Sequence, residues 1–178
     1  MINIALRLAM RALHVLRTEG ARVLANKLCR RLRVVAFRPQ KPHLIQAEEP
    51  YAPLSLPAAG ERQLASVILP TCGNFSYTHR CLAALSAAGD TSSFEVILID
   101  DEPAGDTAAR LKFYGNLRVL KNEKNLGFVH SCNRGAVAAR GQFLVFLNND
   151  TQVQPGWLDA LLDTFAHQPD AGLVGSRL

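Results

Sequence analysis

The stretch that decides the fold is Gly141–Pro155, which reads Gly-Gln-Phe-Leu-Val-Phe-Leu-Asn-Asn-Asp-Thr-Gln-Val-Gln-Pro. Its apolar run, Phe143–Leu147, consists of strand-forming residues and predicts a strand that is buried on both faces of a sheet. Three polar side chains follow at once, namely Asn148, Asn149 and Asp150. A change of this kind places oxygen ligands at the carboxyl end of a central strand, where open α/β sheets bind their ligands.

This polar cluster offers a carboxylate oxygen from Asp150 and a neutral oxygen from Asn148, two residues earlier. Mg²⁺ and Mn²⁺ prefer carboxylate, carbonyl and water oxygens as ligands. The sequence therefore predicts a divalent cation at this loop, holding a diphosphate. The residues alone leave an alternative open, in which Asn-Asn-Asp-Thr only forms a turn and caps the next helix.

Strand and helix patterns alternate on both sides of this stretch, from Leu64 onward. Alternation at this spacing predicts an α/β fold with a mostly parallel sheet and right-handed crossovers. A phosphate-binding Rossmann enzyme is not indicated, because no Gly-x-Gly-x-x-Gly follows the first strand. The expected strands are 65–69, 94–99, 117–120, 142–147 and 171–174, and the expected helices are 77–88, 107–113, 129–139 and 155–166.

Polar groups follow three of these strands, at Thr71–Asn74, Asp100–Asp101 and Asn148–Asp150. In a parallel sheet these strand ends lie on one edge, so the polar groups can meet in one crevice. The pair of acids indicates function, because adjacent carboxylates repel each other and are seldom placed together for packing. Gly127 permits a tight backbone approach before the preceding helix, and Asn133 could reach a ligand from that helix.

Taken together, these segments resemble the family 2 glycosyltransferases of the GT-A fold, and in particular the rhamnosyltransferase-like members. The resemblance covers about residues 64–178, with the segments in the family's order and spacing. It implies a Rossmann-like nucleotide-binding half in an enzyme that uses Mg²⁺ or Mn²⁺ to transfer a sugar, with inversion, from a nucleoside diphosphate sugar to a glycan or lipid-linked acceptor. The resembling segments are Ser66–Pro70, Glu95–Asp101, Asn122–Phe128, Phe146–Asp150 and Pro155–Leu158.

The resemblance also implies roles for single residues. Asp101 and Asp100 would contact the nucleoside, Thr71 would lie along the base, and Asp150 would bind the metal in place of the family's Asp-x-Asp motif. The chain departs from the family in having Cys72 and Gly73 after Thr71, where a tyrosine and an asparagine are common. The expected donor-binding residues are Pro70, Thr71, Asp100, Asp101, Gly127, Asn133, Asn148 and Asn149.

The catalytic base is not assigned to any residue of this chain. Inverting transfer needs a base that takes the proton of the acceptor hydroxyl, and the family has this base on a later segment. The remaining acids, Asp159, Asp163 and Asp170, are interpreted as solvated surface groups. We therefore expect the donor-binding part of a glycosyltransferase, without the acceptor half. Two alternatives are a nucleotide-sugar-binding module without transfer activity and a basic-arm interaction protein with a vestigial domain.

Charge is unevenly distributed along the 178 residues. Residues 1–42 hold ten Lys and Arg against one acid, a net charge of +9, and residues 43–178 hold ten against fourteen, a net charge of −4. The main domain is therefore mildly acidic, which does not favour a nucleic-acid partner. Two basic amphipathic helices are predicted, at 4–18 and at about 21–36, within an arm over residues 1–37. Such an arm could lie on an anionic membrane, or pack as a helical hairpin on its own domain or on another chain.

Residues 38–63 contain five of the nine prolines and predict an extended, loosely ordered linker. The four cysteines form no Cys-x-x-Cys pair and have no histidine at zinc spacing, which is typical of reduced thiols in the cytoplasm. No apolar run approaches the roughly 18–20 residues that span a membrane, and no signal peptide is indicated. The expected location is cytoplasmic, with peripheral contact at the inner face of the plasma membrane left open.

Overall fold

The computed structural model describes residues 44–45, 50–58 and 64–176, and the chain divides into two units, Met1–Pro42 and His43–Leu178. The first unit lies outside the described residues, so the predicted basic arm and its two helices stay predictions. The fold below is that of the second unit. In the part of the chain that the structure describes, no helix is long and apolar enough to cross a membrane.

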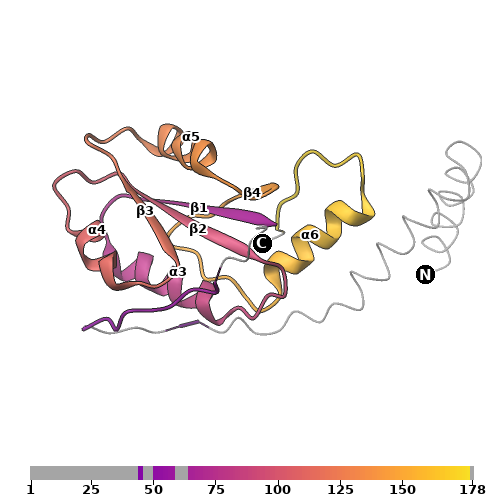
Figure 1. Ribbon diagram of the computed structural model, residues 1–178, viewed down its shortest axis with the longest axis horizontal. Coiled ribbons are helices and arrows are strands. Elements are labelled where there is room, and N and C mark those ends of the chain that lie inside the picture. The colour runs from indigo at the N-terminus through magenta and orange to yellow at the C-terminus, as the bar shows by residue number, and fades with distance from the viewer. Residues whose placement is uncertain (1–43, 46–49, 59–63, 177–178) are drawn as a thin grey trace, which may run out of the picture. The chain divides into compact units, whose positions relative to one another are not determined.

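Four parallel strands form the sheet at the centre of this unit (Figure 1). They are β1 (Ala65–Thr71), β2 (Phe94–Asp100), β3 (Leu117–Lys121) and β4 (Phe143–Phe146), in the order β3-β2-β1-β4. The parallel α/β fold expected from the sequence is therefore confirmed. The strand predicted at 171–174 is wrong, because residues 171–176 pair with no strand among the described residues and begin with a turn in which Ala171 N–H donates to the Gln168 carbonyl (2.9 Å).

Helices cover both faces of the sheet. The helices are α3 (Phe75–Ala87), α4 (Thr107–Arg110) with the 3₁₀ turn η1 (Leu111–Phe113), α5 (Phe128–Ala138) and α6 (Trp157–His167). Side chains alternate along β1, so Val67 and Leu69 pack with α3, η1 and α6, whereas Ile68 packs with α5. Figure 1 shows α5 on one side of the sheet and α3 and α4 on the other. This double cover explains why every residue of β1 and β2 is buried.

The last strand, β4, lies at the edge of the described sheet, which corrects the prediction that it is buried on both faces. Its residues aligned with Ser66 and Ile68, namely Leu144 and Phe146, are 45% and 52% exposed. They lie on the α5 face, but α5 packs over β1 and β2 and leaves them uncovered. Only the opposite face of β4 joins the core. A continuous apolar run does not distinguish such an edge strand from a central one.

Residues 50–58, which fall within the predicted linker, pack against the domain. Leu56 is 2% exposed, and its N–H donates to the Gly115 carbonyl at 3.1 Å. The N–H of Gly115 in turn donates to the Leu54 carbonyl at 2.9 Å, and Ser55 forms a parallel bridge with Gly115. The expectation of loose order therefore does not hold for this part of residues 38–63.

Candidate functional site

The strand order places a topological switch point between β1 and β4. The chain proceeds from β1 through β2 to β3 on one side, and then returns to place β4 on the other side of β1. Open α/β sheets bind ligands in the crevice outside the carboxyl ends of their strands at such a point. The two segments that leave the sheet there are Thr71–Asn74 and Asn148–Asp150, both predicted from the sequence to carry binding groups.

Pro70 lies where β1 and β4 separate at this edge, and its position there is compatible with the sheet. Backbone groups of successive strand residues face opposite neighbours. The Ile68 carbonyl accepts from Leu147 N–H on the β4 side (3.0 Å), whereas the Thr71 carbonyl accepts from Asp101 N–H on the β2 side (2.8 Å). Pro70 therefore faces β4, whose pairing has already ended opposite Ile68, so its missing N–H costs no ladder hydrogen bond. The chain leaves the sheet directly after Leu147.

Of the three residues in the polar cluster, Asn149 faces the protein and its two neighbours face solvent. The Asn149 side-chain amide donates to Thr71 Oγ1 and to Thr78 Oγ1, both at 3.1 Å. Asn148 and Asp150 are exposed. The nucleotide contact of Asn149 stays a prediction, and in this structure its amide hydrogens are engaged with β1 and α3.

Cys81 lies beneath the same loop. Its thiol is fully buried and donates a weak hydrogen bond to the Asn148 carbonyl, with Sγ and O 3.7 Å apart. Burial, and to a smaller extent the negative charge of Asp150, raise the pKa of Cys81 to about 12. The thiol therefore stays protonated at neutral pH and acts as a neutral donor.

Asp101 uses its carboxylate to hold the loop before α5. The side chain is 4% exposed, and Oδ1 accepts from the Asn122 amide at 2.6 Å and from Leu126 N–H at 2.8 Å. Oδ2 accepts from Gly127 N–H at 2.8 Å. Burial raises the pKa of Asp101, but the hydrogen bonds from Leu126, Asn122 and Gly127 outweigh it, so the pKa lies below its ordinary value.

Asp100 faces the other side of the sheet and has no exposed surface. Its Oδ1 accepts from Glu102 N–H at 3.2 Å, and its Oδ2 accepts from Ala108 N–H at 3.1 Å in the first turn of α4. Neither acid of the pair opens to solvent in this structure, so their contact with a nucleoside stays a prediction. Their observed task is to order the loops that follow β2 and β3.

The remaining predicted residues lie around α5. Gly127 precedes the helix with φ of 80° and has no atom within 4 Å of the position of an added Cβ, so its conformation rather than a close approach requires glycine. Asn133 is exposed on α5. Pro70 and Thr71 are buried at the end of β1.

Three residues in this region were not singled out as site residues by the sequence analysis: Thr78, Asn122 and Asn125. Asn125 is exposed, and its side-chain amide donates to the Asp101 carbonyl at 3.2 Å and to Cys72 Sγ at 3.4 Å. Since a carbonyl only accepts, the NH₂ group must face it, and Oδ1 is left to accept from elsewhere. The signal available in the sequence was an asparagine, Asn125, two residues before the glycine that precedes α5.

The donor set fits a cation that is shared with a ligand. Among the described residues, no group of three His, Cys, Asp or Glu side chains could hold a metal ion. Asp150 and Asn148 offer one carboxylate and one amide oxygen from exposed positions. Mg²⁺ commonly binds through one or two carboxylates plus water and phosphate oxygens, so these residues suit Mg²⁺ or Mn²⁺ with a diphosphate. They would not form a metal centre by themselves.

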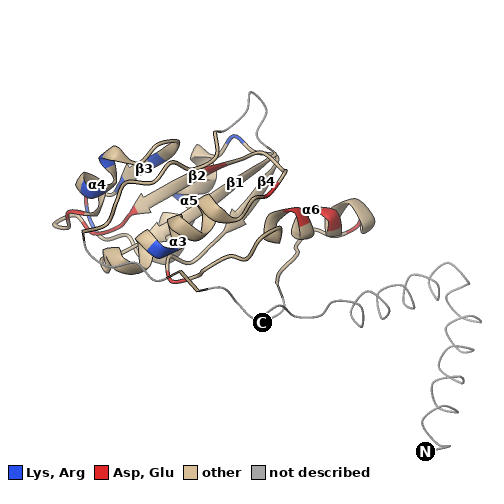
Figure 2. Ribbon diagram, turned by 90° about the horizontal axis from the view of Figure 1, so that it is seen from below, with Lys and Arg blue, Asp and Glu red and all other residues tan. Residues whose placement is uncertain are grey.

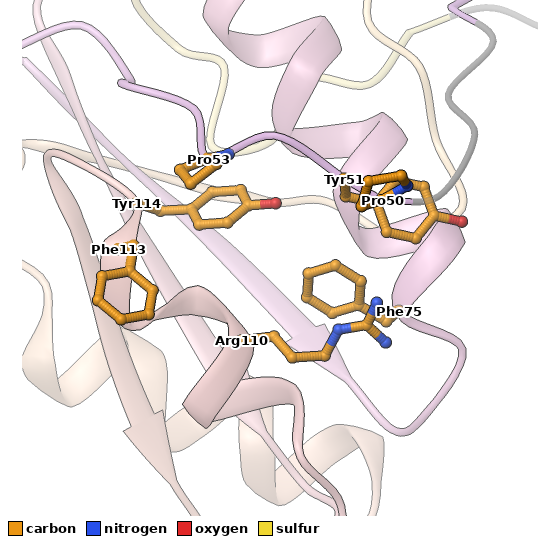
Figure 3. A pocket seen from close by; sticks show the side chains of 7 residues that line it. All are labelled: Pro50, Tyr51, Pro53, Phe75, Arg110, Phe113 and Tyr114. Carbon is orange, nitrogen blue, oxygen red and sulfur yellow. The ribbon is translucent and has the colours of Figure 1, made fainter.

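A cavity of about 530 Å³ lies beside this region and contains none of the predicted site residues. It forms where residues 50–53 cross the beginning of α3 and η1 (Figure 3). The guanidinium of Arg110 stacks on Phe75, 3.9 Å from the ring centroid. The cavity is lined by Pro50, Tyr51, Pro53, Phe75, Arg110, Phe113 and Tyr114.

Asp159 is not the solvated surface group that the sequence predicted. α6 carries Asp159 and Asp163, coloured red in Figure 2. The Asp159 carboxylate accepts from Thr91 N–H at 2.9 Å and from Ser92 N–H at 3.0 Å, in the loop that leads into β2. Hydrogen bonds from Ser92 and then Thr91 lower its pKa to about 2. This loop lies at the amino ends of the strands, so Asp159 holds the edge opposite the crevice. Asp163 and Asp170 are exposed, as predicted.

The fold is an open, parallel α/β sheet with polar residues at the carboxyl ends of its strands, and the family comparison identifies its class. The model for glycosyl transferase family 2 matches residues 66–178. The chain belongs to this family, and its parallel sheet with flanking helices is the nucleotide-binding part of a GT-A fold.

Named relatives carry different activities. The chain is 29% identical over 121 residues to N-acetylglucosaminyl-diphospho-decaprenol L-rhamnosyltransferase of Mycobacterium tuberculosis, covering 61% of this chain and 39% of the relative. It is 32% identical over 81 residues to polypeptide N-acetylgalactosaminyltransferase 5 of Caenorhabditis elegans, covering 42% of this chain and 13% of the relative. The crystal structure of S. aureus TarS is similar with a TM-score of 0.51 and 26% identity, covering 58% of this chain and 19% of TarS.

The match therefore spans between 13% and 39% of the length of these proteins. What they share with this chain is the donor-side fold of glycosyltransferases. The sugars and acceptors that their names specify are properties of those proteins.

Proposed function

We propose that this chain binds a nucleoside diphosphate sugar, with Mg²⁺ or Mn²⁺, in the crevice between β1 and β4. The sugar is presented there for inverting transfer to a glycan or lipid-linked acceptor. The observation that carries this proposal is the alternation at the end of β4, where Asn148 and Asp150 are exposed on either side of the inward-facing Asn149. The family membership supports the reaction class.

In this proposal, Asp150 and Asn148 hold the cation against the diphosphate. The cation supplies charge neutralisation, which makes the nucleoside diphosphate a better leaving group. Pro70 and Thr71 lie on the β1 side of the crevice, where the base binds. Cys72 lies near the base at the position where a tyrosine is common in the family. Asp100 and Asp101 act on the nucleoside through the loops that they order, with Gly127 and Asn133 at the α5 side.

The acceptor class is proposed from the rhamnosyltransferase relative, whose name specifies a diphospho-decaprenol lipid. A lipid-linked acceptor places the reaction at the cytoplasmic face of the membrane, in the synthesis of cell-wall or surface polysaccharide. The basic residues 1–37 are the segment proposed to contact that surface, because cationic helices bind anionic lipids. Liposome binding of the full chain, compared with the chain lacking residues 1–37, tests this contact.

Thermal unfolding tests the donor site directly. A ligand that binds only the native state raises the melting temperature by mass action. We expect UDP, GDP or dTDP with Mn²⁺ to raise it, and Asp150→Ala to remove the metal-dependent part of the rise. Asp170→Ala, which removes an exposed acid after α6, serves as the matched control and should behave as wild type. If none of the three diphosphates moves the transition, the donor site is placed wrongly.

A binding module without transfer is the second candidate. It is favoured by the contacts of Asp159, which hold the edge opposite the crevice and so remove one acid from the candidates for a base. Inverting transfer needs such a base within hydrogen-bond reach of the acceptor hydroxyl. Release of nucleoside diphosphate from a bound sugar nucleotide, measured with and without acceptor, separates the two candidates.

A further inference from the structure

We propose that Asn149 is a positioning residue, and that a hydrogen-bonded ring of three side chains, two of them buried, sets the geometry of the cation ligands on either side of it. The ring consists of Asn149, Thr71 on β1 and Thr78 on α3. This inference rests on the proposed function, since it concerns the same site. It assigns to Asn149 a role different from direct contact with the nucleotide.

One arrangement of the hydroxyl protons satisfies every contact in the ring. The Asn149 NH₂ group has two hydrogens, and it donates one to Thr71 Oγ1 and one to Thr78 Oγ1 at 3.1 Å. The two hydroxyl oxygens are 2.9 Å apart, so one must donate to the other. Thr71 Oγ1 also lies 3.4 Å from the Gly73 carbonyl, which can only accept. In the arrangement that uses every hydroxyl proton, Thr78 donates to Thr71 and Thr71 donates to the Gly73 carbonyl.

Burial makes this ring selective for one orientation of the loop. Thr71 is 3% exposed and Thr78 is fully buried. A buried hydroxyl or amide that loses its partner is costly, so the loop cannot rotate Asn149 outward without leaving both threonines short of a partner. Asn149 and Asp150 are the central residues of a turn that is closed by the hydrogen bond from Thr151 N–H to the Asn148 carbonyl at 3.1 Å, so anchoring Asn149 inward fixes the turn that carries Asn148 and Asp150. The exposed, half-buried, exposed pattern of these three residues agrees with this.

α3 supplies a second tether one turn further along. Cys81 follows Thr78 by three residues, so both side chains lie on one face of the helix. The Cys81 thiol donates to the Asn148 carbonyl, as Thr151 N–H does at 3.1 Å. The same face of α3 therefore holds the side chain of one loop residue and the backbone of the preceding one. Neither contact involves a ligand.

The test removes one hydroxyl without changing the shape of the core. Thr78→Val keeps the branched side chain, and Thr78→Ser keeps the hydroxyl. The probe is Mn²⁺ with whichever of UDP, GDP and dTDP binds wild type best, measured by titration calorimetry with and without the metal. Thr164→Val, which removes a hydroxyl that bonds within α6, is the matched control.

We expect Thr78→Val to weaken the Mn²⁺-dependent part of diphosphate binding about tenfold or more, as loss of groups that orient metal ligands commonly does. The metal-independent part should stay as in wild type, and Thr78→Ser should restore the metal-dependent part. Equal binding by Thr78→Val and wild type overturns the inference. Equal loss of both parts also overturns it, because the hydroxyl would then serve only the fold. A wild-type chain that binds none of the diphosphates overturns the proposed function as well, which separates that failure from the others.

Discussion

Asp101 and Asp159 are two acids whose carboxylates are used by the protein itself, at opposite edges of one sheet. Asp101 accepts two backbone N–H groups and one side-chain amide in the loop before α5. Asp159 accepts two backbone N–H groups in the loop before β2. Hydrogen bonds from fixed donors favour the ionised form, and the pKa of each acid is correspondingly below its ordinary value.

Asp101→Asn tests the loop-ordering role. The substitution keeps the shape but turns one acceptor oxygen into an NH₂ group that faces backbone N–H donors. We expect a loss of about 2–3 kcal/mol in the free energy of unfolding, which is the scale of hydrogen bonds to a charged group. Urea unfolding at pH 7 measures it, with Asp106→Asn in the exposed loop after β2 as the control. Equal stability of the two variants would contradict the role given to Asp101.

Asp159 gives a pH dependence with a defined sign. Its pKa is about 2 in the folded chain and 3.8 as the ordinary value, so the folded state favours the ionised form. Its contribution to stability is present above pH 3.8 and is lost as the pH falls towards 2. We expect Asp159→Asn to unfold at lower urea concentration at pH 6 and to differ less from wild type at pH 2.5. A difference in stability between Asp159→Asn and wild type that grows as the pH falls would contradict this prediction.

At the scale of elements, α5 reaches the sheet because of one glycine. A Cβ at Gly135 would overlap Cγ2 of Ile68, which is fully buried on β1. We expect Gly135→Ala to cost about 1–3 kcal/mol through overpacking, despite the higher helix propensity of alanine. Gly172→Ala is the control, because no atom lies within 4 Å of its added Cβ. Thermal or urea unfolding of both variants decides, and a neutral Gly135→Ala would mean that α5 shifts freely.

Element type followed from sequence more readily than element position. β1 and β2 were predictable because apolar runs between polar strand ends have a strong signal, and their helices followed from 3.6-residue spacing. The edge position of β4 was not predictable, since Phe143–Leu147 has the same composition as a central strand. Leu144 and Phe146 are exposed only because α5 is placed over other strands. The segment at 171–174 looked like a strand by composition, but it forms no pairing in the described structure.

The site was predictable as a set of strand ends and not as a set of orientations. Sequence placed Thr71, Asp101 and Asp150 at one edge, which the parallel sheet confirms. It could not show that Asn149 faces inward, because that depends on two threonine hydroxyls from different elements. The burial of the acid pair was also hidden from the sequence, since the backbone donors to Asp101 come from Leu126 and Gly127, 25 and 26 residues further along the chain.

For the whole molecule, the proposed donor site predicts that cation and nucleotide binding depend on each other, because few protein groups would hold the cation. Asp150 is the one carboxylate in the cluster Asn148–Asp150, so in the proposed site the diphosphate would supply further oxygens to the cation. We expect Mn²⁺ to bind weakly alone and more tightly with a nucleoside diphosphate, which must itself bind more tightly with Mn²⁺ by the same factor. Calorimetric titration of each in the presence of the other measures both factors. A nucleoside monophosphate should show a smaller factor, and tight Mn²⁺ binding without any nucleotide would contradict the expectation.

The edge position of β4 also affects how often this strand opens by local unfolding. Within the described sheet this short strand is bound on one side only, to β1, and the loop that carries Asp150 continues directly from it. Strands held on one side open by local unfolding more often than central ones, so amide hydrogens of β4 should exchange with deuterium sooner than those of β2. A diphosphate and Mn²⁺ that bind to the loop would require β4 to be paired with β1, so their binding would stabilise the paired strand. We expect the addition of both ligands to slow hydrogen exchange in β4 more than in β2. Exchange that slows equally in both strands would show that ligand binding is not coupled to local opening of β4.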